Sequence, residues 1–247
     1  MKTRTALFAA AASLMLATSA VTFAADAVPA YVTAAVNDAG RPQANKDLDA
    51  TRHPAAVLAF TGVKPGDKVI EFVPGGGYNT RLLSKLVGAN GKVYSIELMS
   101  FPDRMKDAIK PVTDDKGYAN VAVSVQDATK LKVDQPADVA WVSENYHDFK
   151  NMGPFQTDTN GLNKAVFAAL KPGGLYVIND YEAAAGSGTR DTQMLHRIDP
   201  AVIKQEVQAA GFQFVGESPA LKVPSDNLGE RSHQTSSQVL YKFRKPG

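Results

Sequence analysis

Three consecutive glycines, Gly75 to Gly77, follow a short apolar segment and precede a segment with helical periodicity. Glycine lets the backbone turn sharply and approach a ligand closely, and the first turn of a helix offers free N–H groups. Glu97 ends the next apolar segment, about 20 residues further on, where a carboxylate accepts ribose hydroxyls in nucleotide-binding folds. We therefore predict that these residues bind a nucleoside-containing ligand. The alternative for Glu97 is a solvated carboxylate at a strand end.

A second group of reactive side chains, Glu144 to Asp148, follows the fourth apolar segment. Histidine titrates near neutral pH, so His147 can act as a general base if Asp148 or another neighbour orients its ring. Asp180 ends the fifth apolar segment and is expected to face the same crevice. These three residues, together with Tyr146, are the predicted catalytic residues. In the structural alternative, His147 and Asp148 only cap the following turn.

No metal site is predicted. The four histidines, His53, His147, His196 and His233, lack a spacing such as His-x-x-x-His that places two rings on one helix face. The chain has no cysteine, which excludes disulfides, a thiol nucleophile and a thiolate metal site. His196 and the adjacent Arg197 are candidates for contact with a substrate anion, and an exposed helix entry explains them equally well.

Alternating strands and helices would bring these residues together. Buried parallel strands are expected at 68–73, 92–97, 121–126, 137–143 and 175–180. Helices are expected at 54–61, where Pro54 begins and Gly62 ends the segment, and at 79–87, 101–110 and 161–170. Right-handed crossovers then place the carboxyl ends of the strands at one edge of the sheet, where such folds bind ligands.

The C-terminal region departs from this alternation. A helix is expected from the Asp199 N-cap and Pro200 to Gly211. Strands at 212–218 and 238–243 follow with no helix between them, so they should pair antiparallel. The predicted fold class is therefore a Rossmann-like α/β fold with a mostly parallel seven-stranded sheet and an antiparallel C-terminal strand.

The first 25 residues have the layout of a secretory signal. Lys2 and Arg4 precede an apolar stretch from Ala6 to Ala17, and small residues surround Ala24 and Ala25. This stretch is shorter than the roughly 20 residues that cross a bilayer. We expect cleavage near Ala24/Ala25 and a periplasmic or secreted protein without stable membrane insertion. The alternative is a retained N-terminal anchor helix.

The expected organisation is a signal peptide at 1–25, an N-terminal arm or lid at 26–52 and one domain at 53–247. The polar segment 38–49 is expected to be extended because it has few apolar residues. The net charge of +2 includes two positive residues of the signal, and no basic run contains interleaved aromatics. Nucleic acid is therefore not an expected partner.

The sequence resembles the class I S-adenosylmethionine (SAM) dependent methyltransferases across nearly the whole mature chain. The matching segments are 69–77, which ends in the glycines, 93–97, which ends in Glu97, and 170–175 before the fifth strand. More narrowly, the runs 74–78 and 145–148 resemble a bacterial group of predicted, often exported methyltransferases.

The resemblance implies SAM as the cofactor and assigns residues to its parts. Gly75 and Gly77 would line the methionine part, Glu71 would lie near its amino group, and Glu97 would hold the ribose. Asp127 matches the position that binds the adenine amino group, with a turn-forming Asp as the alternative. The predicted cofactor site also includes the neighbouring residues Pro74, Gly76, Tyr78, Leu98, Ala128 and Asn145.

One residue departs from the family pattern: Val73 stands where the first glycine of the family's acidic-x-Gly-x-Gly-x-Gly motif should be. Because valine does not easily adopt a positive φ, the loop is expected to differ there.

The leading functional hypothesis is SAM-dependent methyl transfer to a small-molecule substrate, with the acceptor atom and oligomeric state unassigned. An exported enzyme would need a supply of SAM outside the cytoplasm. The alternative is therefore a non-catalytic protein of this fold that binds a small ligand or nucleoside. A nicotinamide-dependent oxidoreductase is disfavoured because the glycines are contiguous rather than spaced as Gly-x-Gly-x-x-Gly.

Overall fold

The computed structural model describes residues 28–247, so the expected signal peptide lies outside the described residues. Seven strands form one sheet in the order β3-β2-β1-β4-β5-β7-β6. Their bounds are β1 (Lys68–Phe72), β2 (Lys92–Leu98), β3 (Val121–Gln126), β4 (Ala137–Ser143), β5 (Leu170–Tyr181), β6 (Gln213–Glu217) and β7 (Gln238–Arg244). β7 is antiparallel to both of its neighbours, and the other pairs are parallel. The predicted fold class is confirmed.

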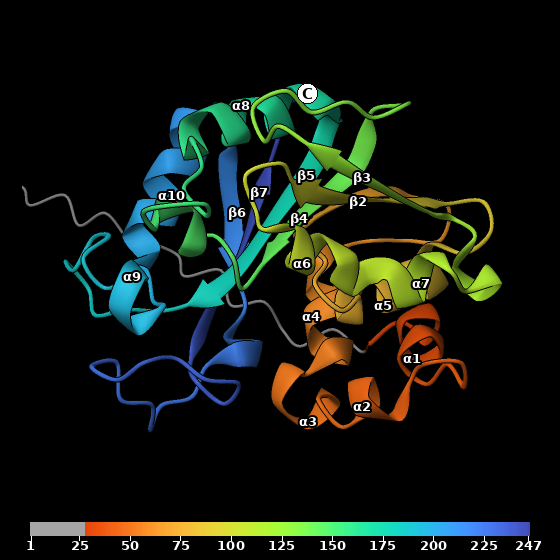
Figure 1. The fold of residues 1–247 in the computed structure, drawn as a ribbon, viewed down its shortest axis with the longest axis horizontal. Coiled ribbons are helices and arrows are strands. Elements are labelled where there is room, and N and C mark those ends of the chain that lie inside the picture. The colour runs from red at the N-terminus through yellow and green to blue at the C-terminus, as the bar shows by residue number, and fades with distance from the viewer. Residues whose placement is uncertain (1–27) are drawn as a thin grey trace, which may run out of the picture.

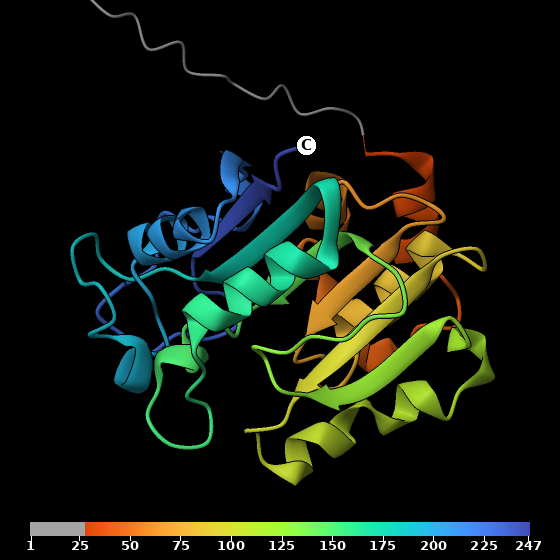
Figure 2. The ribbon, with the colours of Figure 1, turned by 90° about the horizontal axis from the view of Figure 1, so that it is seen from above.

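Helices cover both faces of the sheet (Figures 1 and 2). One face packs against α1 (Ala30–Val36), α4 (Pro54–Thr61) and α5 (Tyr78–Val87), and the other against α8 (Thr159–Ala169) and α10 (Pro200–Ala209). The short helices are α2 (Gln43–Lys46), α3 (Asp49–Arg52), α6 (Asp103–Lys106), η1 (Asp107–Ile109), α7 (Lys110–Thr113), η2 (Lys116–Tyr118), η3 (Asp148–Lys150), α9 (Thr192–Leu195) and η4 (Pro219–Leu221).

The two larger hydrophobic cores follow from this layering, one on each face of the sheet. In β4, Val139 and Trp141 belong to the core beneath α4 and α5, whereas Ala140 and Val142 belong to the core beneath α8 and α10. Successive side chains of a strand point to opposite faces, so a strand covered on both sides is apolar at nearly every position. This is why the strand segments were recognisable without alternation.

The helix expected over 101–110 is broken. α6 begins only at Asp103, after Pro102, and η1 separates it from α7, in which Pro111 occupies the first turn. Proline lacks an N–H group and clashes with the preceding turn, so a continuous helix cannot pass through Pro111. The segment therefore forms three short turns.

The N-terminal segment 38–49 is not extended, contrary to the sequence prediction. It contains the short helix α2, and the buried Arg41 guanidinium forms two hydrogen bonds to Asp49, of 2.9 and 2.6 Å. Asp49 in turn accepts a hydrogen bond of 2.7 Å from the hydroxyl of Tyr78 at the start of α5. Polar contacts, which hydrophobic patterning does not detect, thus fold this segment against the domain. Its role as a lid stays a prediction.

Within residues 28–247, no helix combines the length and apolar character that crossing a membrane requires.

Candidate functional site

The loop between β1 and α5 adopts left-handed backbone conformations at three positions. Val73 has φ 51°, Gly75 has φ 53° and Gly77 has φ 78°. Val73 thus adopts the positive φ that valine disfavours, and a β-branched residue there carries strain of about 1–3 kcal/mol. The Val73 N–H donates to the carbonyl of Ile96 at 2.9 Å, which ties the loop to the end of β2.

Gly76 and Gly77 are glycines for different reasons. A Cβ at Gly77 would lie 2.4 Å from Val112 Cγ2, so packing and φ both require glycine there. Gly76 has no positive φ, and a Cβ there would meet no heavy atom of the described residues within 4 Å. Neither internal packing nor backbone conformation requires glycine at this exposed position. The open space is what a ligand in close contact with the backbone needs.

Glu97 lies beside this loop, because β1 pairs in parallel with β2 and Phe72 lies opposite Ile96. It shares a face of β2 with Ser95, whose hydroxyl bonds to Glu71. Glu97 is 1% exposed, and neither carboxylate oxygen has a hydrogen-bond partner among residues 28–247. Burial raises the pKa of Glu97 to about 7, although Lys106 opposes the shift. A buried carboxylate of this kind is costly unless a ligand supplies donors.

Glu71 is buried on β1 and points at α5. Its Oε2 accepts hydrogen bonds from Thr80 Oγ1 at 2.7 Å and from Ser95 Oγ at 3.0 Å. Burial raises the pKa of this carboxyl group to about 7 despite both bonds, and Glu97 adds to the shift. Glu71 thus links β1, β2 and α5 beneath the loop, and its predicted contact with a methionine amino group stays a prediction.

The other predicted cofactor residues surround the loop and the ends of β2 to β4. Pro74 is buried and its carbonyl accepts from Gly77 N–H at 2.9 Å, while Leu98 and Ala128 are buried core residues. Asp127 Oδ1 accepts from the backbone N–H and hydroxyl of Thr129 at 2.9 and 2.8 Å, so the turn-forming alternative describes its geometry. Asn145 Nδ2 donates to the carbonyl of Ser143 at 2.6 Å.

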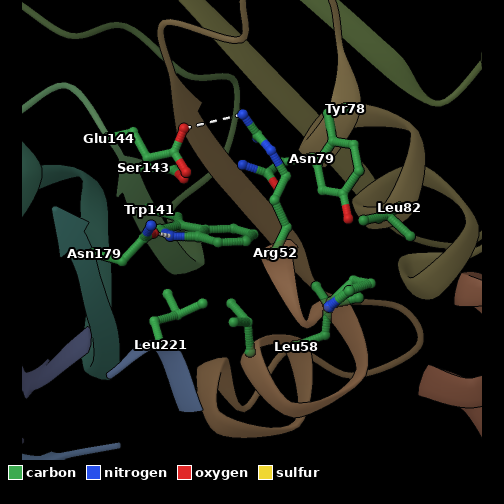
Figure 3. A pocket seen from close by; sticks show the side chains of 12 residues that line it. Arg52, Leu58, Tyr78, Asn79, Leu82, Trp141, Ser143, Glu144, Asn179 and Leu221 are labelled. Atoms are coloured by element: carbon green, nitrogen blue, oxygen red, sulfur yellow. Dashed lines mark hydrogen bonds and ion pairs between the residues drawn. The ribbon is translucent and has the colours of Figure 1, made fainter. Parts of the chain in front are cut away.

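A narrow pocket next to the loop brings the predicted Tyr78 together with residues that the sequence analysis did not assign to the site (Figure 3). Its wall includes Tyr78 from α5, Trp141 from β4 and Arg52 at the end of α3. The Arg52 guanidinium lies 4.7 Å from the centroid of the Tyr78 ring and donates to Glu144 Oε2 at 3.0 Å. Its Nε is buried and has no hydrogen-bond partner among the described residues. No sequence motif marks Arg52, which ends α3 directly before a left-handed turn at His53 with φ 43°.

His147 lies at the carboxyl ends of β4 and β5, where Asp180 orients it. Asp180 Oδ1 lies 2.7 Å from His147 Nδ1, and Asp180 Oδ2 accepts the backbone N–H of His147 at 2.6 Å. Burial by itself lowers the pKa of His147, but Asp180 and Asp148 outweigh it and raise that pKa to about 10. Both carboxylates favour the protonated ring, and the role of His147 as a general base stays a prediction.

Two further predicted catalytic residues do not face a crevice. The side chain of Asp180 is fully buried, and its oxygens are occupied by backbone and imidazole N–H groups. The hydroxyl of the buried Tyr146 donates to Glu206 Oε2 and accepts from Asn163 Nδ2, both at 2.8 Å. Tyr146 therefore anchors α8 and α10 to the sheet. Arg197 is likewise fully buried and bonds to Asp226, so it is not exposed to a substrate anion.

Comparison with known proteins gives one family. The model of the family described as protein-L-isoaspartate(D-aspartate) O-methyltransferase matches residues 4–144, more than half of the chain. A protein-L-isoaspartate O-methyltransferase of Ignicoccus hospitalis is 33% identical over 88 residues, covering 35% of this chain and 40% of the relative. A protein-L-isoaspartate O-methyltransferase of Methanococcus maripaludis is 26% identical over 155 residues, covering 62% of this chain and 63% of the relative. The chain thus spans less than two thirds of the length of these relatives.

Solved structures agree on the fold. A SAM-dependent methyltransferase from Aquifex aeolicus matches 83% of this chain and 98% of its own, with a TM-score of 0.58 and 20% identity. At that identity the likeness shows the fold alone.

The family match both confirms and corrects the sequence predictions. It shows that the chain belongs to a methyltransferase family, which agrees with the predicted class and with SAM as the expected methyl donor. It contradicts the small-molecule acceptor and partner, because the family is described by methylation of protein isoaspartate. The residues present fit the donor: Glu97 has two unpartnered oxygens for two ribose hydroxyls, and Gly76 leaves space above the backbone.

Proposed function

Because the chain belongs to the protein-L-isoaspartate(D-aspartate) O-methyltransferase family, we propose that it methylates a carboxylate oxygen of isoaspartyl residues in proteins. An isoaspartyl residue is linked through its side-chain carbonyl and so presents a free α-carboxylate. When bound, SAM supplies an activated methyl group. The family match is the observation that carries this proposal, and the geometry at Glu97 and Gly76 supports it.

In this proposal the residues of the chain mainly bind the methyl donor and align it with the acceptor carboxylate. Glu97 would accept hydrogen bonds from the ribose hydroxyls, and the backbone of Gly75 to Gly77 would hold the methionine part. Asp127 and its neighbours Leu98 and Ala128 lie where the adenine is expected. A carboxylate acceptor is already ionised at neutral pH, so no general base is required and the rate depends on alignment. The proposed reaction therefore does not depend on the protonation state of His147.

Arg52 is our candidate for recognition of the acceptor carboxylate. A guanidinium binds a carboxylate through two parallel N–H groups, and Arg52 has a buried Nε without a partner beside an Nη2 held by Glu144. The Arg52 guanidinium lies over the Tyr78 ring, and this cation–π contact helps to orient it. An incoming carboxylate would thus find one free donor and one whose present partner can be exchanged.

The proposal is tested with matched peptides that differ only in an isoaspartyl or an aspartyl residue. The full chain is incubated with each peptide and with SAM that carries a labelled methyl group. We expect a base-labile methyl ester on the isoaspartyl peptide alone, and its loss in the Glu97→Ala variant. SAM binding without transfer to the isoaspartyl peptide would refute the proposal.

The role of Arg52 is tested by Arg52→Ala, with Arg244→Ala as the matched control on an exposed arginine at the far end of β7. We expect KM for the isoaspartyl peptide to rise by about tenfold or more, the cost of one charge-assisted hydrogen bond, while SAM affinity stays unchanged. A loss of SAM affinity instead would assign Arg52 to the methionine carboxylate of the donor.

We also propose that the protein belongs to an exported bacterial group, on the basis of Lys2, Arg4 and the apolar stretch from Ala6 to Ala17. N-terminal sequencing of the protein from fractionated cells tests this. We expect a mature N-terminus near Asp26 in the periplasmic or secreted fraction. A chain that retains Met1 in the cytoplasm would refute export without affecting the enzymatic proposal.

A further inference from the structure

We propose that His147, Asp148 and His196 form a binding site for a divalent transition-metal ion and that Zn²⁺ is the metal their geometry fits. This site is separate from the glycine loop and does not depend on the proposed methyl transfer. It differs from the expectation drawn from the sequence, in which no histidine spacing indicated a metal.

The distances among the three ligand atoms carry the proposal. His147 Nε2 lies 3.1 Å from His196 Nδ1 and 3.3 Å from Asp148 Oδ1, and His196 Nδ1 lies 3.4 Å from the same Asp148 oxygen. A tetrahedral Zn²⁺ with bonds of about 2.0–2.1 Å requires ligand atoms about 3.3–3.4 Å apart. The three atoms therefore form a triangle that matches one face of such a tetrahedron.

Asp180 holds the ring nitrogen of His147 that is not one of the three ligand atoms. It lies 2.7 Å from His147 Nδ1, so that nitrogen carries the proton and the lone pair of Nε2 faces the other two ligand atoms. A carboxylate that holds the far nitrogen of a histidine is a usual partner of metal-binding imidazoles, because it fixes the tautomer and orients the ring. Asp180 is fully buried and also holds the backbone N–H of His147.

The ligands come from two segments that the fold brings together. His147 and Asp148 stand at the start of η3, directly after β4, and His196 ends α9, which packs against η3. His196 adopts a left-handed conformation with φ 51° and ψ 50°, an uncommon backbone state for a residue other than glycine. This turn directs the His196 ring back toward His147, with the ring centroids 5.1 Å apart.

The site is open on one side. The His147 side chain is buried, but that of His196 is 30% exposed, so the cluster borders solvent. Three protein ligands with an accessible fourth position are the arrangement of zinc sites that bind water or a substrate group, whereas structural sites have four protein ligands. The expected exchangeable ligand is a water molecule or a carboxylate.

The competing explanation is a hydrogen-bond network in which a proton takes the place of the metal. In that case His147 Nε2 donates to His196 Nδ1 or Asp148. The two explanations differ in affinity for a metal, not in the geometry of the unliganded site, so metal binding separates them.

The test uses the full chain without an affinity tag, stripped with a chelator and titrated with Zn²⁺ against a chromophoric competitor in the absence of SAM. We expect one tight site per chain. His196→Ala and Asp148→Asn should each weaken Zn²⁺ binding by about 100-fold or more, and Asp180→Asn by about 10- to 100-fold. His233→Ala, an exposed histidine outside the cluster, is the matched control and should bind like the wild type.

Two further measurements keep the result decisive if a variant folds poorly. Zn²⁺ should raise the Tm of the wild type and the His233→Ala variant but not that of His196→Ala. Co²⁺ bound to the wild type should give the intense visible spectrum of a tetrahedral site. Zn²⁺ affinity equal in wild type and ligand variants would overturn the site, as would preferential binding of Mg²⁺ or Mn²⁺.

Discussion

Two polar regions share the carboxyl edge of the sheet and differ in whether their charged groups have partners. Around the glycine loop, the buried Glu97 has no hydrogen-bond partner among the described residues, and Gly76 leaves space unfilled. Around His147, the carboxylate of Asp180 accepts three N–H groups at 2.6–2.8 Å. The first region therefore has free acceptors and space for a ligand, whereas the hydrogen bonds of the second region fix its geometry without one.

The largest expected effect comes from the region around His147, where Asp180 already has its hydrogen-bond partners. Asp180→Ala leaves the buried His147 ring and two backbone N–H groups without their acceptor, so we expect a loss of about 3–5 kcal/mol in the free energy of unfolding. Denaturant unfolding of the purified variant measures it. A stability equal to that of the wild type would show that the two regions do not differ as described.

Glu97→Gln tests the region around the glycine loop, where the substitution should weaken ligand binding without lowering stability. Two charge-assisted hydrogen bonds to ribose hydroxyls are lost or weakened, so we expect SAM affinity to fall by about 100-fold or more. The unliganded variant should be at least as stable as the wild type, because the substitution breaks no hydrogen bond of Glu97 to another described residue. Calorimetry and thermal unfolding measure the two quantities. Glu217→Gln, at an exposed strand end, is the control.

Neighbouring glycines sharpen the comparison within the loop itself. Gly77→Ala places a Cβ 2.4 Å from Val112 at a positive φ, and we expect it to destabilise the fold by about 2–4 kcal/mol. Gly76→Ala should leave the Tm nearly unchanged but weaken SAM binding by about tenfold, because the methyl group occupies ligand space. Equal effects of both variants on stability would contradict a ligand-facing role for Gly76.

The pH dependence of stability should also reveal Glu97. Burial raises its pKa from the ordinary 4.5 to about 7, so the folded state holds this proton more tightly than the unfolded state. The unliganded protein therefore loses stability as pH rises from about 4.5 to about 7, and Glu97→Gln removes this loss. We expect the Tm advantage of the variant to be larger at about pH 8 than at about pH 5. Glu71 contributes in the same direction, because loss of the Glu97 charge removes one of the causes that raise its pKa.

The smallest effect is expected at Asp127. Its carboxylate is engaged by Thr129 and lies 3.3 Å from the exposed Lys130. Asp127→Asn keeps the acceptor oxygen of the turn, so SAM affinity should fall by less than about threefold, within the range of exposed polar contacts. A loss as large as that of Glu97→Gln would give Asp127 a direct role in binding.

Local pattern predicted much of the fold and the first region, because the information lies in neighbouring residues. Apolar runs located the strands, and glycines followed by Glu97 located the loop and the acidic strand end. The second region required contacts between residues far apart in sequence, such as His147 with His196, which no periodicity encodes. The Arg41–Asp49 ion pair was not predicted for a related reason, because its segment is held by polar contacts and lacks the apolar pattern that indicates a core.

Val73 shows where residue preference was a poor guide. Valine disfavours a left-handed conformation, yet the hydrogen bond to Ile96 and burial of the Val73 side chain in the core hold it there. Tertiary contacts therefore overrode the local preference at the one position where the motif departs from its family.

The unpartnered carboxylate of Glu97 has a consequence for how long the protein survives in the cell. The unliganded fold bears the cost of that buried group, and donor binding removes it, so occupancy shifts the balance between folded and unfolded chains. Because proteases act on the unfolded fraction, the steady-state amount of this protein should follow the local supply of methyl donor. Its abundance would then report whether the compartment in which it resides can sustain its chemistry.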